Sequence, residues 1–137
     1  SLDALLAAAD FVSVHVALHP ETRGLLGVDA LARMKPGAVL VNTSRGGIVD
    51  EAALADALRS GRLGAAGLDV FSREPLDPAS PLLGLPNAVL TPHIGSASEA
   101  TRTRMVELAV ENLLAALAGD RMPHCANPAV YAKPTGS

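Results

Sequence analysis

The sequence predicts an α/β fold in which a parallel β-sheet is flanked by helices. Short apolar runs begin near residues 11, 38, 65 and 88, and they are too short for helices and rich in the aliphatic residues of buried strands. A helix or a long crossover separates each run from the next. Continuous apolar strands joined by such crossovers are typical of a parallel sheet that is covered on both faces.

The composition fits a globular protein and argues against nucleic-acid binding. The chain has 137 residues, of which 49% are hydrophobic and 18% charged, enough for one domain with a real core. The formal net charge is −3, and only 2% of the residues are aromatic. Neither a basic face nor a set of stacking side chains is therefore available for nucleic acid.

The sequence also predicts a cytoplasmic protein that does not engage a membrane. No apolar run is long enough to cross a bilayer, and residues 1–20 lack the features of a signal peptide. The single cysteine, Cys125, has no partner for an internal disulfide, which fits a reducing compartment.

The first part of the chain reads as helix, strand, helix, strand. Proline and glycine mark the turns between these elements, with one turn around residues 19–24 and another at residues 35–37. The predicted elements are a helix over 2–9, a strand over 10–16, a short helix over 28–34 and a strand over 38–43.

The second part continues the alternation and ends in a long helix. Gly61 is expected to stop the first of its helices, and Gly119 the last. The predicted elements are a helix over 50–60, strands over 65–70 and 88–91 with a proline-rich loop between them, and a helix over 98–118 that begins near Ser98 or Thr101. We therefore expect one domain over residues 1–119 and a tail over residues 120–137.

Polar residues lie at or just after the carboxyl end of each predicted strand, where ligands bind in parallel sheets. They are His15, Arg45, Asp69 with Glu74, and His93. Arg45 stands in the stretch Asn42-Thr43-Ser44-Arg45-Gly46-Gly47, and its planar fork of donors suits a carboxylate or a phosphate. Alone it could equally be a surface arginine, but its partners at the other strand ends favour a site. We expect Gly46 and Gly47 to keep the backbone slim beside a cofactor.

Three of these residues suit the reduction of a 2-oxo acid. Arg45 can hold the acid's carboxylate, and His93 can protonate the carbonyl oxygen near neutral pH. Glu74 can fix the tautomer of the imidazole and favour its protonated form. None of them carries a hydride, so a nicotinamide cofactor is needed.

Each of these residues also has an ordinary structural explanation. A histidine after a strand is usually a satisfied polar residue, and a loop glutamate such as Glu74 usually faces solvent. Asp69 is harder to explain in this way, because a carboxylate at the end of a buried strand needs partners.

We predict no metal site. His15 and His19 are four residues apart, but Pro20 and the strand pattern prevent the helical pairing of a zinc motif. His124 beside Cys125 lacks further ligands at a suitable spacing. Nucleophile-elbow and P-loop motifs are also absent from the sequence.

Three sequence blocks resemble the D-isomer-specific 2-hydroxyacid dehydrogenases, a family that includes phosphoglycerate dehydrogenase and glyoxylate/hydroxypyruvate reductase. They occur in the family's order and spacing: Ser44-Arg45-Gly46-Gly47-Ile48-Val49-Asp50-Glu51, then Gly67-Leu68-Asp69-Val70-Phe71 with Glu74-Pro75, then Thr91-Pro92-His93-Ile94-Gly95-Ser96. The resemblance implies the second half of a doubly wound, Rossmann-like parallel sheet, in an enzyme that uses NAD or NADP.

The resemblance also implies residue roles. Arg45 matches the substrate-carboxylate arginine, Glu74 the acid that orients the histidine, and His93 the general acid/base. Asp69 matches an aspartate that binds the nicotinamide carboxamide. The implied cofactor contacts are Val16, Thr43, Ser44, Arg45, Asp69, His93, Gly95 and Ser96.

The chain departs from the family in two places. It has Ala17-Leu18-His19 where members often have Pro-Leu-Thr, and it lacks their Gly-x-Gly-x-x-Gly turn. We therefore expect the C-terminal part of a longer enzyme, acting as a homodimer or in association with the missing N-terminal part. The alternative is a catalytically silent module for cofactor binding or assembly.

Overall fold

The computed structural model describes residues 1–132, so the last five residues of the predicted tail lie outside the described part. The chain divides into two compact units, Ser1–Gly95 and Ser96–Ser137. The grouping of the long helix with the sheet in one domain stays a prediction, because this division reflects contacts within the chain alone.

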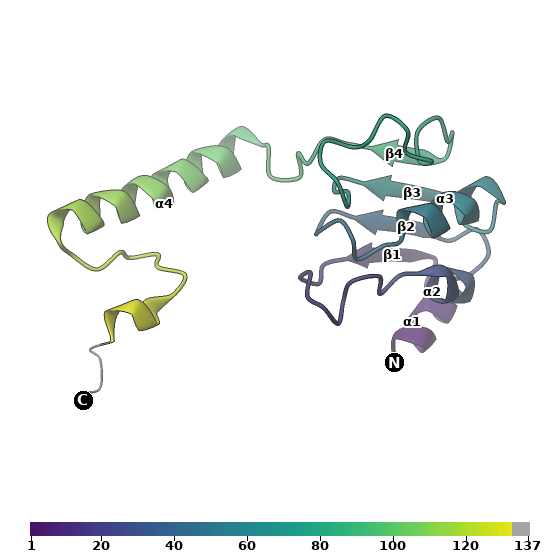
Figure 1. Cartoon of the computed structure of the whole chain (residues 1–137), viewed down its shortest axis with the longest axis horizontal. Coiled ribbons are helices and arrows are strands. Elements are labelled where there is room, and N and C mark those ends of the chain that lie inside the picture. Colours follow the sequence, from purple (N-terminus) through teal and green to yellow (C-terminus); the bar gives the residue numbers. More distant parts are fainter. Residues whose placement is uncertain (133–137) are drawn as a thin grey trace. The chain divides into compact units, whose positions relative to one another are not determined.

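The first unit contains a four-stranded parallel sheet. Its strands are β1 (Phe11–Val14), β2 (Val39–Asn42), β3 (Ala65–Leu68) and β4 (Ala88–Leu90), and they lie side by side in the order of the sequence (Figure 1). The predicted α/β fold with a parallel sheet is confirmed. Each strand is shorter than predicted, because the backbone leaves the ladder at the strand ends to form turns.

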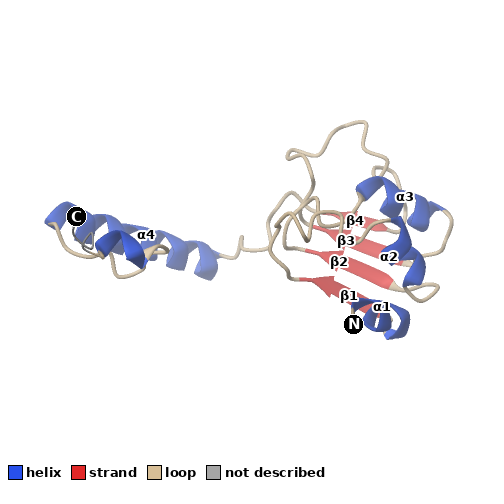
Figure 2. Cartoon of the chain, turned by 60° about the horizontal axis from the view of Figure 1, so that its bottom comes forward, coloured by secondary structure: helices blue, strands red, loops and turns tan. Residues whose placement is uncertain are grey.

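Three helices, α1 (Leu2–Ala8), α2 (Val28–Arg33) and α3 (Glu51–Arg59), accompany the sheet. Neighbouring helices in this series pack against each other, and Figure 2 shows them gathered beside the strands. Asp50 caps α3, since its carboxylate accepts hydrogen bonds from the N–H groups of Ala52 and Ala53, both at 3.0 Å. Leu54, Ala55 and Leu58 form the buried side of this helix.

The helices cover one face of the sheet. Strand residues alternate between buried and accessible, and those of the buried set are Val12, Val14, Leu40, Asn42, Ala66 and Leu68. On the opposite face Phe11 is 76% exposed and Val89 67% exposed. Within Ser1–Gly95 the helices cover only one face, and the expectation that both faces are covered stays a prediction. Successive right-handed crossovers between adjacent strands place their helices on the same side.

The second unit contains α4 (Glu99–Ala118) and a short 3₁₀ helix, η1 (Pro128–Tyr131). Ser98 caps α4 by accepting a hydrogen bond from the N–H of Thr101, and Gly119 ends it at φ 81°. None of the residues of α4 is buried. Within residues 1–132 no helix combines the length and apolar character that a membrane span requires.

Candidate active site

The turn after β2 is held from inside by Asn42, the last residue of that strand. Its buried side chain donates from Nδ2 to the carbonyl of Arg45 at 3.0 Å and accepts at Oδ1 from the N–H of Ser44 at 3.1 Å. Ser44 in turn donates from Oγ to the carbonyl of Val16 at 2.7 Å, which joins this turn to the segment after β1. The backbone that carries Arg45 is therefore fixed by two side chains.

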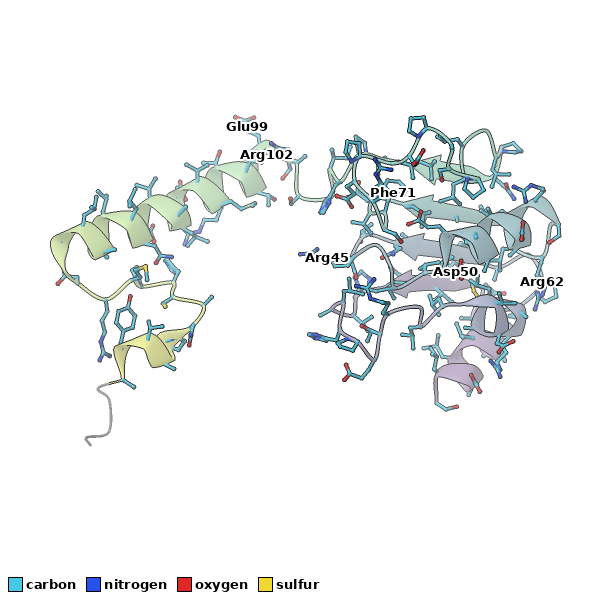
Figure 3. All side chains as sticks on the ribbon, viewed as in Figure 1. Arg45, Asp50, Arg62, Phe71, Glu99 and Arg102 are labelled. Carbon is cyan, nitrogen blue, oxygen red and sulfur yellow. The ribbon has the colours of Figure 1, made fainter. Side chains whose placement is uncertain are left out.

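The side chain of Arg45 is exposed at the carboxyl-terminal edge of the sheet (Figure 3). Its guanidinium makes one hydrogen bond, from Nη1 to the carbonyl of Ser44 at 2.7 Å. A hollow of about 540 Å³ adjoins it, lined by His15, Val16, Ala17, Leu18, Ser44 and Arg45. The guanidinium of Arg45 therefore keeps most of its N–H donors available beside an open cavity.

Asp69, directly after β3, anchors the turn that follows β4. Its Oδ1 accepts hydrogen bonds from Thr91 Oγ1 at 2.6 Å and from the N–H of Ile94 at 2.8 Å. Its Oδ2 accepts one from the N–H of Gly95 at 2.7 Å. Burial acts to raise the pKa of Asp69, but these three hydrogen bonds and nearby His93 outweigh it, and the pKa lies below its ordinary value. Asp69 is therefore a buried carboxylate that keeps its charge.

His93 lies in the turn that Asp69 anchors, and it faces Glu74. Its Nδ1 is 2.7 Å from Glu74 Oε2, while Glu74 Oε1 accepts a hydrogen bond from the N–H of Phe71 at 3.0 Å. The hydrogen bond with His93 and then the one from Phe71 lower the pKa of Glu74. His93 has φ 55°, a left-handed conformation that is uncommon outside glycine and that costs about 1–3 kcal/mol. Both the backbone and the imidazole ring of His93 are therefore held in place.

A second hollow, of about 370 Å³, adjoins His93 and Glu74. Its remaining lining is largely apolar and consists of Phe71, Pro75, Leu76, Leu83, Leu90, Thr91 and Pro92. The hollow therefore places an apolar surface beside a histidine–carboxylate pair whose side chains are still 48% and 38% exposed.

The structure brings Glu74, Asp69 and His93 into one cluster, whereas Arg45 lines the other hollow. The stretch that carries Arg45 and the loop that carries Glu74 are in backbone contact at Gly46. A Cβ on Gly46 would lie 1.9 Å from the carbonyl carbon and oxygen of Phe71, so only glycine fits this contact. We expected Gly46 to let the backbone come close to a cofactor, whereas the contact in the structure is with the backbone of Phe71.

Other predicted contact residues are accessible to solvent. Val16 is 43% exposed, and Thr43 and Ser96 are exposed. A Cβ on Gly95 would lie 3.1 Å from Asp69 Oδ2, so this residue approaches the carboxylate closely.

Sequence reasoning gave no role to Asn42 or Thr91, although both support the site. An asparagine at the end of an apolar strand is a usable signal, because a buried amide needs partners and the following turn supplies them. No comparable signal marks Thr91, since its partner lies 22 residues away.

No cluster of three or more histidine, cysteine, aspartate or glutamate side chains suited to a metal occurs among residues 1–132. His15 Nε2 is 2.8 Å from Ser13 Oγ, and His124 Nε2 is 2.7 Å from Glu111 Oε2.

The nicotinamide end of a dinucleotide fits these residues. Asp69 Oδ2 has one protein donor and keeps capacity for a second, as from a carboxamide N–H. Val16 and Ala17 offer an accessible apolar wall to a ring. The sequence offers no Gly-x-Gly-x-x-Gly turn for the pyrophosphate.

Comparison with known proteins gives the family. Residues 1–95 match the model of the D-isomer specific 2-hydroxyacid dehydrogenase, NAD binding domain. The glyoxylate/hydroxypyruvate reductase B of Pectobacterium atrosepticum is 54% identical over 129 residues, which are 94% of this chain and 40% of that protein. The chain therefore spans about 40% of the length of this relative.

Solved structures agree. The TT0316 protein from Thermus thermophilus superposes with a TM-score of 0.86 at 58% identity, covering 90% of this chain and 39% of that one. A D-isomer specific 2-hydroxyacid dehydrogenase from Xanthobacter autotrophicus Py2, in complex with NADPH and MES, has a TM-score of 0.74 at 42% identity, covering 93% and 52%. The predicted resemblance and the Rossmann-like fold are confirmed, and the chain belongs to the D-isomer specific 2-hydroxyacid dehydrogenase family.

Proposed function

We propose that this chain carries the acid/base and nicotinamide-binding part of an enzyme that interconverts a 2-oxo acid and a D-2-hydroxy acid with NAD(H) or NADP(H). The observation that carries the proposal is the 2.7 Å contact between His93 Nδ1 and Glu74 Oε2, at the edge of the sheet that also presents Arg45. A histidine with a carboxylate on one nitrogen is a common arrangement for a general acid.

In this proposal Arg45 binds the substrate's carboxylate through its fork of donors. Because Nδ1 of His93 faces Glu74, Nε2 is the atom that gives its proton to the carbonyl oxygen during reduction and takes one from the hydroxyl in the reverse direction. The carboxylate of Glu74, on the Nδ1 side, holds the ring in the orientation that leaves Nε2 free for the substrate.

We assign Asp69, and further residues near the ends of the strands, to binding of the cofactor. Asp69 accepts a hydrogen bond from the nicotinamide carboxamide and fixes the ring's orientation toward His93. Val16, Thr43, Ser44, Gly95 and Ser96 are the further predicted contacts. When bound, NADH or NADPH supplies the hydride that reduces the carbonyl carbon.

The names of relatives suggest which substrates to try first. Glyoxylate/hydroxypyruvate reductase B and the NADPH complex concern other proteins, but they make glyoxylate, hydroxypyruvate and both dinucleotides the appropriate probes. The test is loss of NADH or NADPH absorbance that depends on the 2-oxo acid. An intact protein that contains this sequence and shows no such loss with either dinucleotide would contradict the proposal.

A second candidate is a catalytically silent module for cofactor binding or assembly. The position of β1 at the edge of the sheet, with Phe11 76% exposed, would suit an assembly role. Tight dinucleotide binding, or complex formation, without any turnover would support this candidate over the enzyme. An intact mass measurement on the native protein separates a 13.9 kDa chain from a longer one.

We also propose a homodimer, or association with an N-terminal part, and a cytoplasmic location. The exposed face of the sheet supports association, because isolated proteins seldom leave large apolar side chains such as Phe11 and Val89 unpaired on one surface. Sedimentation analysis tests the first proposal, and fractionation of the source cells tests the second.

A further inference from the structure

We propose that Glu51, in the first turn of α3, is a positioning residue for the pair formed by His93 and Glu74, and that it acts through the N–H of Ser72. This inference rests on the proposed function, since that function gives His93 and Glu74 their roles.

Glu51 reaches across the chain to hold the loop after β3. Its Oε1 accepts a hydrogen bond from the N–H of Ser72 at 2.6 Å, although the two residues are 21 positions apart. An acid in the first turn of a helix is usually explained by the helix dipole or by capping. Asp50 already caps α3, so the contact with Ser72 is an additional role for Glu51.

Two carboxylates hold consecutive N–H groups of this loop. Glu51 accepts from Ser72, and Glu74 accepts from Phe71 at 3.0 Å while its other oxygen faces His93. Hydrogen bonds to a charged acceptor are stronger than those between neutral groups. The direction of the Glu74 carboxylate toward the imidazole therefore depends on a backbone segment that Glu51 fixes.

Packing on the same segment limits how it can move. The backbone of Phe71 and Ser72 lies against Gly46, where a Cβ would come within 1.9 Å of Phe71 and 2.5 Å of the nitrogen of Ser72. Gly46 follows Arg45, and Glu51 begins α3 five residues later. One stretch of chain thus supplies the proposed substrate arginine, the contact surface for the loop and the acid that holds it.

Amide hydrogen exchange, followed by NMR at Phe71 and Ser72, tests this inference without any need for catalysis. In Glu51→Ala we expect exchange to become about tenfold faster at Ser72 and also at Phe71, because the loop that presents Glu74 loosens. Glu51→Gln keeps an acceptor but loses the charge, so its effect should be smaller at both sites.

Asp56→Ala is the matched control on the same helix. Asp56 is an exposed acid that pairs with Arg59 at 2.6 Å, and its removal should leave exchange at Phe71 and Ser72 unchanged. Faster exchange at Ser72 alone would overturn the inference, since Glu51 would then bind Ser72 without ordering Glu74. Equal effects of Asp56→Ala and Glu51→Ala would overturn it as well.

Turnover in the intact enzyme gives a second readout. We expect Glu51→Ala to lower kcat about tenfold while KM for the 2-oxo acid stays within about twofold, with partial recovery in Glu51→Gln. A rise in KM with unchanged kcat would overturn the positioning role. If the unmodified enzyme shows no turnover, the proposed function fails, whereas the exchange measurement still decides the role of Glu51.

Discussion

The turns after β2 and β4 both present a charged or ionisable side chain at the carboxyl-terminal edge of the sheet, yet they hold it differently. In the first turn Asn42 and Ser44 fix the backbone, while the guanidinium of Arg45 is exposed and contacts only a neighbouring carbonyl. In the second, Asp69 fixes the backbone and Glu74 holds the ring of His93 as well.

This difference fits the two roles that we propose. A group that moves a proton must be placed within a few tenths of an ångström, so its orientation is best set before the substrate arrives. A group that binds a carboxylate can take its final orientation when the ligand arrives, because two parallel hydrogen bonds then define the geometry. The ordered His93 and the free Arg45 should consequently affect different kinetic constants.

The largest expected effect comes from removing the ordered side chain. His93→Ala should lower kcat about 10²- to 10⁴-fold with little change in KM for the 2-oxo acid, since Arg45 still binds the carboxylate. Steady-state kinetics on the intact enzyme measure both constants, and His124→Ala serves as a control in the second unit. A KM that rises as steeply as kcat falls would contradict the assigned role.

Removing the free side chain should affect binding. Arg45→Ala should raise KM for the 2-oxo acid about 10- to 100-fold, with a smaller loss in kcat, because charged hydrogen bonds to the carboxylate are lost. Arg45→Lys keeps the positive charge but loses the paired donors of the guanidinium, so its KM should lie between that of the unmodified enzyme and that of Arg45→Ala. Arg73→Ala, at an exposed arginine paired with Asp77, is the control. If Arg45→Ala reduced kcat alone, the contrast between the two turns would not hold.

The contact that joins the two turns can be broken at Gly46. Gly46→Ala should lower the free energy of unfolding by about 1–3 kcal/mol, because its Cβ would overlap the backbone of Phe71. Gly67→Ala is a matched control, since its Cβ would meet only Val41 Cγ2 at 3.9 Å. Urea unfolding of the 137-residue chain compares the two, and equal losses would mean that the contact at Gly46 is not special.

The smallest expected effect is a dependence of stability on pH. The folded protein lowers the pKa of Asp69 and of Glu74 below their ordinary values of 3.8 and 4.5. The unfolded chain therefore binds more protons in acid, and the stabilisation is complete above pH 4.5 and is lost as the pH falls through the lowered pKa values. Thermal unfolding between about pH 6 and 3 should show this loss.

Asp69→Asn is the informative variant for this pH dependence. It removes one of the two lowered pKa values, so its melting temperature should be lower near neutral pH and should fall less steeply in acid. A slope equal to that of the unmodified chain would show that the charge of Asp69 does not support the turn around His93.

Many of the residues at the carboxyl-terminal edge of the sheet were predictable from local sequence patterns. The strands were recognisable from short apolar runs, and Arg45, Asp69 and His93 follow three of them directly or within a few residues. The pairing of Glu74 with His93 was a chemical inference from two residue types, and the structure brings these two together. Their roles in catalysis stay predictions.

Other features of the edge had no local pattern. Asp69 binds groups 22 to 26 positions away, and Gly46 packs against backbone at Phe71. Such contacts depend on how strand ends are placed side by side, which no window of sequence contains. Which face of the sheet α1, α2 and α3 cover was not predictable for the same reason, because apolar strands do not reveal which element packs on them.

The sequence by itself determined the order of strands and helices, the residue types at the strand ends and the family. Periodicity and motif spacing carry that information along the chain. Only the tertiary structure decided that Asp69 and Glu74 hold the turn and ring of His93 while Arg45 stays free. The hydrogen bonds of Asp69 to residues after β4 form because neighbouring parallel strands bring their carboxyl ends together, and packing of the helices on one face fixes that arrangement.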